Sequence, residues 1–180
     1  MHSHSVALIH QRLAQDDTQA VDKRLNTILQ SACELLTLDV AIISNVNRTG
    51  KTYTLAHTFS RTITLPVGKI FPLKVNFCAL AVHRNAPVMI HNMALLSKFR
   101  HPCHNYFTLE AYIGIPIQVN GKTFGTLNFC GTTPHAPFTD TDYALMLNLA
   151  VIVGDLMTLK AKNCAENARE TQVAPIIVTV

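Results

Sequence analysis

Three residues with metal-binding or nucleophilic side chains lie close together near the middle of the chain: His101, Cys103 and His104. Imidazole nitrogens and thiolate sulfurs are the ligands that zinc and other borderline metals prefer. His57 and His91 could join such a site. However, an intervening proline and the H-x-x-H spacing do not give the i, i+4 pairing that fixes two histidines on one helix face. We therefore interpret these residues as parts of a surface or pocket-covering loop rather than as a metal centre.

The chain has five cysteines, an odd number, at wide spacings and without a CxxC pair. This pattern indicates neither a zinc ribbon nor a thioredoxin-type site. Free thiols are typical of the reducing cytosol. Cys33 and Cys78 fall on apolar helix faces and Cys130 ends a predicted strand, so we interpret all three as small core residues. No serine stands in a nucleophile-elbow context either, and we predict no catalysis.

The composition predicts a soluble single domain. A length of 180 residues, with 48% hydrophobic and 14% charged residues, suffices for a core and argues against disorder. The net charge of +4 is small and the basic residues are scattered, whereas a nucleic-acid-binding face needs clustered ones. The most apolar stretch, 143–159, is shorter than the ~20 residues that span a bilayer. Because the N-terminus also lacks a signal-peptide pattern, we predict a cytoplasmic protein with no nucleic-acid or membrane partner.

Periodicity and turn signals predict the secondary structure. An apolar stripe with helical spacing predicts a helix capped by Asp16 or Asp17; its members are Val21, Leu25, Ile28, Ala32 and Leu35. Runs rich in β-prone residues at 40–45 and 51–59 predict a hairpin. Similar runs at 111–119 and 122–130 predict a second hairpin, because the Asn120-Gly121 pair between them favours a tight turn.

The segments between and after the hairpins complete the predicted order. Residues 60–74 predict a loop with one short extended piece, 75–84 a short helix and 88–90 a strand. A long helix follows from Asp140 to about residue 169, with Thr139 as its N-cap. This order predicts an α+β fold with an antiparallel sheet of about five to six strands and the N- and C-terminal helices on one face. We divide the chain into a lead-in at 1–15, a domain at 16–169 and a tail at 170–180 outside the core.

Four segments resemble the GAF domain family. They are FPLKVNFCALAV at 71–82, APVMIHNM at 86–93, the segment 99–131 that ends in TFGTLNFCG, and PFTDTDYALMLNLAVIVGDLM at 137–157. The resemblance extends over roughly residues 20–160. It implies a central antiparallel sheet with a small-molecule pocket on one face and a terminal-helix dimer surface on the other. It also implies a sensory or regulatory function of the kind found in bacterial signalling proteins.

The resemblance further implies which side chains surround the ligand. The segments expected to converge carry aromatic, polar and thiol side chains of the kind that ligand pockets use. The predicted ligand-binding residues are Phe77, Cys78, His91, Cys103, His104, Tyr106, Tyr112 and Asn128. We predict a small-molecule ligand of unknown identity whose occupancy shifts the packing of the first and last helices. The apolar stripe at 21–35 and the apolar face of the last helix are predicted to form a homodimer interface.

Other functions remain open within the same family. Cys103 followed by His104 matches the dipeptide to which phytochrome-like GAF domains attach a bilin, although no other bilin-contacting motif is recognisable. Free methionine sulfoxide reductases are single GAF domains with catalytic cysteines, which here would be Cys78, Cys103 or Cys130. The Asn-Lys-Phe-Asp-Glu pattern of cyclic-nucleotide-binding members cannot be traced. A ligand-free dimerisation module is a further alternative, and the sequence leaves the cofactor unassigned between none, a bilin and a metal.

Overall fold

The computed structural model of the chain describes residues 7–8, 11, 20–47, 49, 51–96 and 109–172. Its elements are α2 (Val21–Leu36), β1 (Val40–Asn47), β2 (Thr52–Ser60), β3 (Ile70–Pro72), η1 (Leu73–Val75), α3 (Phe77–Arg84), β4 (Val88–Ile90), η2 (Met93–Leu96), β5 (Ala111–Val119), β6 (Lys122–Gly131) and α4 (Asp140–Gln172). The strands form one six-stranded sheet in the order β3-β2-β1-β6-β5-β4. Each neighbouring pair is antiparallel.

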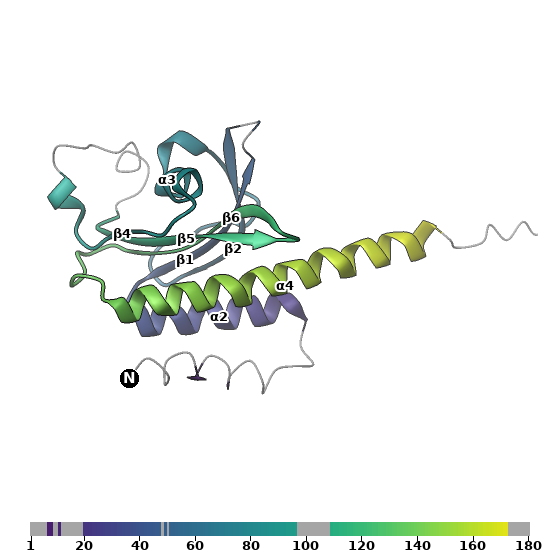
Figure 1. The fold of residues 1–180 in the computed structure, drawn as a ribbon, viewed down its shortest axis with the longest axis horizontal. Coiled ribbons are helices and arrows are strands. Elements are labelled where there is room, and N and C mark those ends of the chain that lie inside the picture. Colours follow the sequence, from purple (N-terminus) through teal and green to yellow (C-terminus); the bar gives the residue numbers. More distant parts are fainter. Residues whose placement is uncertain are drawn as a thin grey trace, which may run out of the picture.

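The sheet separates two layers of helices (Figure 1). α2 and α4 lie side by side on one face, while α3 lies on the opposite face. α2 and α4 run antiparallel, because Asp22 at the start of α2 binds Lys160 of α4, whereas Leu36 at its end accepts a hydrogen bond from His135 just before α4. The predicted α+β fold, with an antiparallel sheet and both terminal helices on one face, is confirmed.

The central strands contribute alternate side chains to two separate cores. In β1, Ala41 and Ile43 belong to the core beneath α2 and α4, whereas Val40 and Ile42 belong to the core beneath α3. This alternation follows from the period of two in a pleated strand. Only the thickness of the sheet therefore separates the α3 side from the terminal helices.

Local sequence signals mark the ends of several elements correctly. Asn120 and Gly121 both have positive φ, at 50° and 70°, as the tight turn between β5 and β6 requires. At the start of α4, the Thr139 Oγ1 accepts the Asp142 N–H at 3.3 Å, while the Asp142 carboxylate accepts the Thr139 N–H at 2.7 Å. This reciprocal pair is a capping box, and it confirms Thr139 as the N-cap.

Two other predicted boundaries are wrong. α2 begins at Val21 after Ala20, which provides no side-chain cap, and Asp16 and Asp17 lie outside the described residues. α3 begins at Phe77 rather than at 75, because Asn76 ends η1 and accepts the Ala79 N–H at 3.2 Å as the N-cap of α3. The extended piece predicted within residues 60–74 is β3. Residues 170–172 of the predicted tail belong to α4, and the rest of that tail lies outside the described residues.

The apolar stripe of α2 is not the exposed surface that was predicted for dimerisation. Leu25, Ile28 and Ala32 are all 0% exposed within the single chain, where they pack in the core beneath α2 and α4. A period of 3.6 residues identifies the apolar face of a helix but does not say whether the same chain or a partner covers it. Here the sheet and α4 cover it.

α4 is long and apolar enough, by length and composition, to cross a membrane between Asp140 and Glu166. The prediction that its apolar stretch is too short to span a bilayer is therefore wrong. However, core helices of soluble proteins meet the same criteria. Leu149, Val153 and Leu156 of α4 are buried against the sheet and α2, which accounts for the apolar composition without a bilayer.

Candidate functional site

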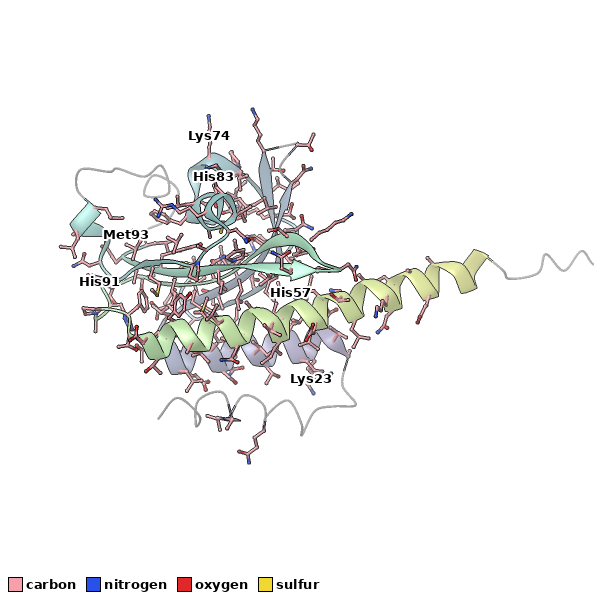
Figure 2. All side chains as sticks on the ribbon, in the orientation of Figure 1. Lys23, His57, Lys74, His83, His91 and Met93 are labelled. Atoms are coloured by element: carbon pink, nitrogen blue, oxygen red, sulfur yellow. The ribbon has the colours of Figure 1, made fainter. Side chains whose placement is uncertain are left out.

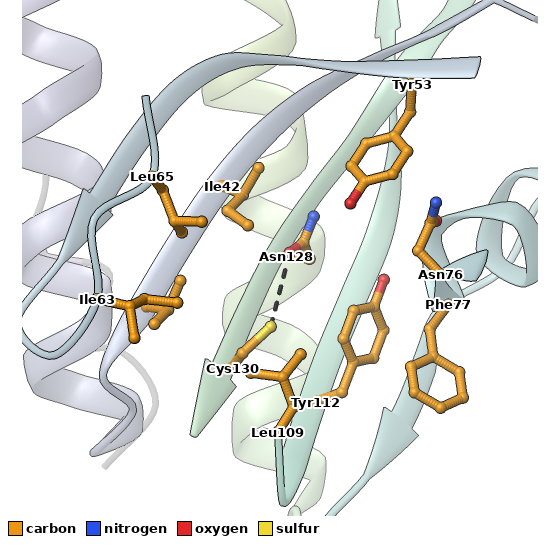
Figure 3. Close-up of a pocket in the computed structure, with 11 residues that line it drawn as sticks. Ile42, Tyr53, Ile63, Leu65, Asn76, Phe77, Leu109, Tyr112, Asn128 and Cys130 are labelled. Carbon is orange, nitrogen blue, oxygen red and sulfur yellow. Dashed lines mark hydrogen bonds between the residues drawn. The ribbon is translucent and has the colours of Figure 1, made fainter. Parts of the chain in front are cut away.

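A small hollow lies between the sheet and α3 (Figure 3). Its free volume is about 30 Å³, which is room for no more than a couple of water molecules. Its walls come from β1, β2, the loop after β2, α3 and the central hairpin. The lining residues are Val40, Ile42, Tyr53, Ile63, Leu65, Asn76, Phe77, Leu109, Tyr112, Asn128 and Cys130. Ile63 is 39% exposed and marks the rim of the hollow.

Asn128 of β6 is the polar centre of this hollow. Its side chain is 2% exposed. The Asn128 Nδ2 donates to the Thr126 Oγ1 at 3.2 Å and to the Cys78 Sγ at 3.4 Å. The Cys130 thiol donates to the Asn128 Oδ1 at 3.8 Å. These contacts hold the amide in one orientation, because each end of it has a distinct partner.

Further hydroxyl groups extend the network behind Asn128. The hydroxyl groups of Ser44 and Thr126, both 0% exposed, share a hydrogen bond of 2.8 Å. The Tyr112 O–H donates to the Cys78 Sγ at 3.7 Å. A buried polar network of this kind is stabilising only when its members are satisfied, and here it fixes the floor of the hollow.

Two buried thiols are poor nucleophiles: Cys78, behind the hollow, and Cys33, in the core beneath α2 and α4. Burial raises the pKa of Cys78, although hydrogen bonds from Thr126, Tyr112 and Ser44 oppose the shift. Burial also raises the pKa of Cys33, to about 12. Because the thiolate is the reactive form, neither cysteine is activated. Among the described cysteines, Cys164 on α4 is exposed, while Cys33, Cys78 and Cys130 are buried.

The lining of the hollow carries no charged side chain among the described residues. Tyrosine, asparagine and cysteine supply its polar atoms, and aliphatic and aromatic carbon supplies the rest. A dianionic phosphate group would need a cationic partner or several N–H groups aimed at it. The described part of the hollow therefore suits a neutral molecule with an apolar body better than a nucleotide.

The structure brings together some of the predicted ligand-binding residues. Phe77, Tyr112 and Asn128 line the hollow, and the Phe77 and Tyr112 rings lie 5.2 Å apart. Cys78 lies one layer behind, in contact with Asn128. His91 does not line the hollow; it follows β4, and its carbonyl accepts the His135 N–H. Cys103, His104 and Tyr106 lie outside the described residues.

Sequence reasoning missed two polar members of the lining. Tyr53 projects from β2 toward the hollow, and Asn76 lies at the start of α3 (Figure 3). The alternation within β2 could have pointed to Tyr53, because it shares a face with Leu55. The preference of asparagine for N-caps could have pointed to Asn76. Within the described ranges, no group of three or more His, Cys, Asp or Glu side chains is arranged to hold a metal ion.

A larger groove of about 520 Å³ lies on the opposite face, beside α4. Its floor is formed by the α3–β4 loop and by β5, and its wall by one side of α4. Tyr143, Leu147 and Val151 line this wall and are 39%, 43% and 64% exposed. They recur every four residues, so they form a single exposed stripe along α4, which we call the α4 stripe.

A six-stranded antiparallel sheet, with terminal helices on one face and a partly polar hollow on the other, defines a class of regulatory α+β domain. Residues 20–155 match the model of the GAF domain family, and the chain belongs to this family. GAF domains form a family of sensory and regulatory modules. No curated protein matches the chain.

Solved structures share the fold at low sequence identity. The GAF domain of an Acinetobacter phosphoenolpyruvate-protein phosphotransferase is similar with a TM-score of 0.72 and 17% identity over 92% of this chain and 98% of that one. The equivalent domain from Coxiella burnetii gives 0.72 and 18%, over 91% and 98%. Free methionine-R-sulfoxide reductase from Neisseria meningitidis, solved with its substrate, gives 0.68 and 15%, over 89% and 91%.

Proposed function

We propose that this GAF domain is a sensor of a small, neutral and largely apolar molecule, which binds in the hollow between the sheet and α3. The observation that carries the proposal is the buried, oriented amide of Asn128 in a lining that is otherwise mostly apolar. Ligand pockets combine an apolar wall with a few fixed polar groups in this way. Because the Nδ2 already donates to Thr126 and Cys78, the amide offers the remaining acceptor site of its Oδ1 to a donor group of the ligand.

The hollow is too small for such a ligand unless its wall moves. A free volume of about 30 Å³ admits no organic molecule of ordinary size, so binding requires the wall to move outward. The rim is the part that can yield, because Ile63 and Leu65 come from a connection between strands, whereas Asn128 lies on a central strand. Binding therefore couples ligand occupancy to a displacement of the wall.

The sheet offers a direct route from the hollow to the terminal helices. Asn128 and Cys130 of β6 face the hollow, while the alternate residues Leu127 and Phe129 are buried in the core beneath α2 and α4. A shift of β6 that enlarges the hollow must also change this second core, since close-packed interiors transmit displacement. We propose that the output is a change in the packing of α2 and α4.

We further propose that the domain is a cytoplasmic homodimer and that the interface includes the α4 stripe. The residues of this stripe are exposed along one line on the helix. Two copies related by a two-fold axis could cover each other's stripe and part of the adjoining groove. Catalysis is not part of the proposal, because burial raises the pKa of the Cys78 thiol, Cys130 is also buried, and a reductase needs an accessible thiolate.

Native mass spectrometry of the protein purified from its own host tests the ligand proposal directly. We expect a bound small molecule that is released on denaturation. Ile63→Trp should abolish the bound mass by filling the rim, whereas Ile70→Trp should retain it. Ile70 is the matched control because it is 63% exposed on β3 and does not line the hollow. A wild-type protein without any bound mass, or an Ile63→Trp variant that keeps it, would contradict the proposal.

A further inference from the structure

Three titratable side chains from different elements meet at one point between the sheet and the terminal helices. The Lys160 Nζ of α4 donates to the Asp22 Oδ1 of α2 at 2.6 Å. The same Nζ lies 3.3 Å from the His57 Nε2 of β2. The His57 Nε2 in turn lies 3.6 Å from the Asp22 Oδ1. One ammonium thus bridges a carboxylate and an imidazole.

The burial of the three side chains is unequal. The side chain of His57 is 9% exposed, whereas those of Asp22 and Lys160 are 59% and 35% exposed. His57 lies between the sheet and α4, while Lys23, the neighbour of Asp22, lies on the solvent side of α2 (Figure 2). The histidine is therefore the fixed member of the group, and the two charged side chains reach toward it from the helices.

The electrostatic surroundings of His57 favour its neutral form. Burial lowers the pKa of His57, and the Lys160 ammonium lowers it further, while the Asp22 carboxylate opposes both effects. Asp22 from α2 and Lys160 from α4 are the charged groups that face the imidazole. The residue paired with it on β1 is the aliphatic Ile43. A neutral imidazole accepts the Lys160 N–H through its Nε2, which a protonated imidazole cannot do.

Lys160 lies where the buried part of α4 ends and its exposed part begins. Met157, 8% exposed, is the last buried residue of the helix among the side chains that the structure describes. Residues 161–166 are exposed, and the helix continues past the edge of the sheet (Figure 1). Lys160 thus ties α4 to α2 and β2 just beyond the last buried turn among the described side chains of the helix. Loss of its contacts therefore leaves α4 held to the domain only as far as Met157.

We propose that Asp22, His57 and Lys160 form a proton-operated latch that fastens the part of α4 around Lys160 to α2 and the sheet when His57 is neutral and releases that part when His57 is protonated. The released state follows from the shared oxygen. A protonated His57 can donate its Nε2–H to the Asp22 Oδ1, and it repels the Lys160 ammonium at the same time. Lys160 then loses the imidazole as an acceptor, is repelled by its charge and shares the Asp22 carboxylate with it, whereas α2 and β2 remain linked through Asp22 and His57.

The direction of the pH dependence follows from the lowered pKa of His57. Above the ordinary histidine pKa of about 6.5, the imidazole is neutral in both the closed and the open state, and the latch has its full stability. As the pH falls below that value, the open state takes up a proton more readily than the closed one. The opening equilibrium constant therefore rises by up to about tenfold per pH unit, until the closed state is also protonated.

Hydrogen–deuterium exchange of the full-length protein, read by mass spectrometry and corrected for the intrinsic pH dependence, tests the latch. We expect peptides covering 156–166 to lose protection by up to about tenfold for each pH unit below about 6.5, while β6 peptides stay protected. His57→Gln accepts the lysine N–H but does not titrate, so its protection should be independent of pH. His83→Gln, which removes an exposed histidine from α3, should behave like the wild-type protein.

A second variant keeps the latch testable if His57→Gln does not fold. Lys160 is partly exposed, so Lys160→Met should fold and should exchange at about pH 8 as the wild-type protein does at about pH 5. Wild-type protection in 156–166 that does not change with pH would overturn the latch. So would a pH response that persists in His57→Gln, or one that is as large in β6 as in α4.

Discussion

At the scale of single residues, the cysteines show how burial decides reactivity. Cys78 has several hydrogen-bond donors around its sulfur, an arrangement that would stabilise a thiolate at an exposed site. Its complete enclosure outweighs them, and its pKa is raised. Cys33 has no such network, and its pKa reaches about 12. Burial of these thiols therefore argues against the reductase alternative, whatever the number of cysteines in the chain.

Thiol labelling of the native protein should separate the cysteines by burial. With iodoacetamide at neutral pH, we expect Cys164 to be alkylated and Cys33, Cys78 and Cys130 to remain unlabelled until denaturant is added. Peptide mapping by mass spectrometry reports each site separately. Rapid native labelling of Cys78 or Cys130 would show that the hollow admits reagents, and it would revive the reductase alternative.

The oriented amide of Asn128 should also matter for folding stability. Asn128→Leu removes the partner of two thiols and of the Thr126 hydroxyl, and we expect it to lower the free energy of unfolding by about 1–3 kcal/mol. Urea denaturation measures this loss. Asn148→Ala is the matched control, because Asn148 is exposed on α4 and its amide bonds only to the helix backbone. An equal effect of the two substitutions would show that the Asn128 network contributes nothing.

At the scale of elements, the close approach of α4 to the end of β5 depends on one glycine. A Cβ atom at Gly154 would lie 2.5 Å from the backbone oxygen of Gln118. The contact is to backbone, so a flexible side chain cannot yield. The glycine therefore sets how closely the last helix packs on the sheet, at a point nearly two helical turns before the Lys160 latch.

Gly154→Ala should reverse the usual effect of this substitution. In an exposed helix, replacing glycine with alanine stabilises by about 1 kcal/mol. Here we expect a loss of about 1–3 kcal/mol, because the helix must move away from β5 and strain the packing. Chemical denaturation measures the sign. A more stable variant would mean that α4 can shift outward without loss, which would also weaken the proposed coupling between sheet and helix.

At the scale of the whole molecule, the apolar stripe of α2 is buried within the single chain, whereas the predicted homodimer stays a proposal. The α2 stripe is internal, so aspartate at Leu25 or Ile28 should unfold the domain rather than separate two copies. The α4 stripe remains available, and it borders the groove of about 520 Å³. Exposed apolar side chains gain about 25 cal/mol for each Å² that a partner covers.

Charged substitutions in the α4 stripe should yield folded monomers. We expect Leu147→Asp combined with Val151→Asp to convert a dimer into a monomer in sedimentation velocity, with unchanged secondary structure by circular dichroism. Leu95→Asp, which alters a 67% exposed leucine on η2, should leave the dimer intact. If the wild-type protein is monomeric at tens of micromolar, or the double variant stays dimeric, the α4 stripe is not the interface.

The sequence alone was enough to predict most of the helices and strands and the α+β fold that they form. Asn120-Gly121 predicted the central hairpin, because few other residues tolerate positive φ at both turn positions. Thr139 predicted the start of α4, since a hydroxyl can satisfy an otherwise unpaired N–H. Each of these signals acts over a few residues and needs no knowledge of the rest of the chain. The GAF resemblance rested on such segments taken in order.

Tertiary structure decided what the elements face and which distant residues meet. Periodicity found the apolar side of α2 but could not say that the sheet and α4 cover it. Phe77, Tyr112 and Asn128 gather at the hollow while His91 lies elsewhere, because strand pairing and not sequence distance sets these positions. Asp22, His57 and Lys160 are far apart in the sequence, and only the packing of both terminal helices on one face of the sheet brings their charges within hydrogen-bonding distance.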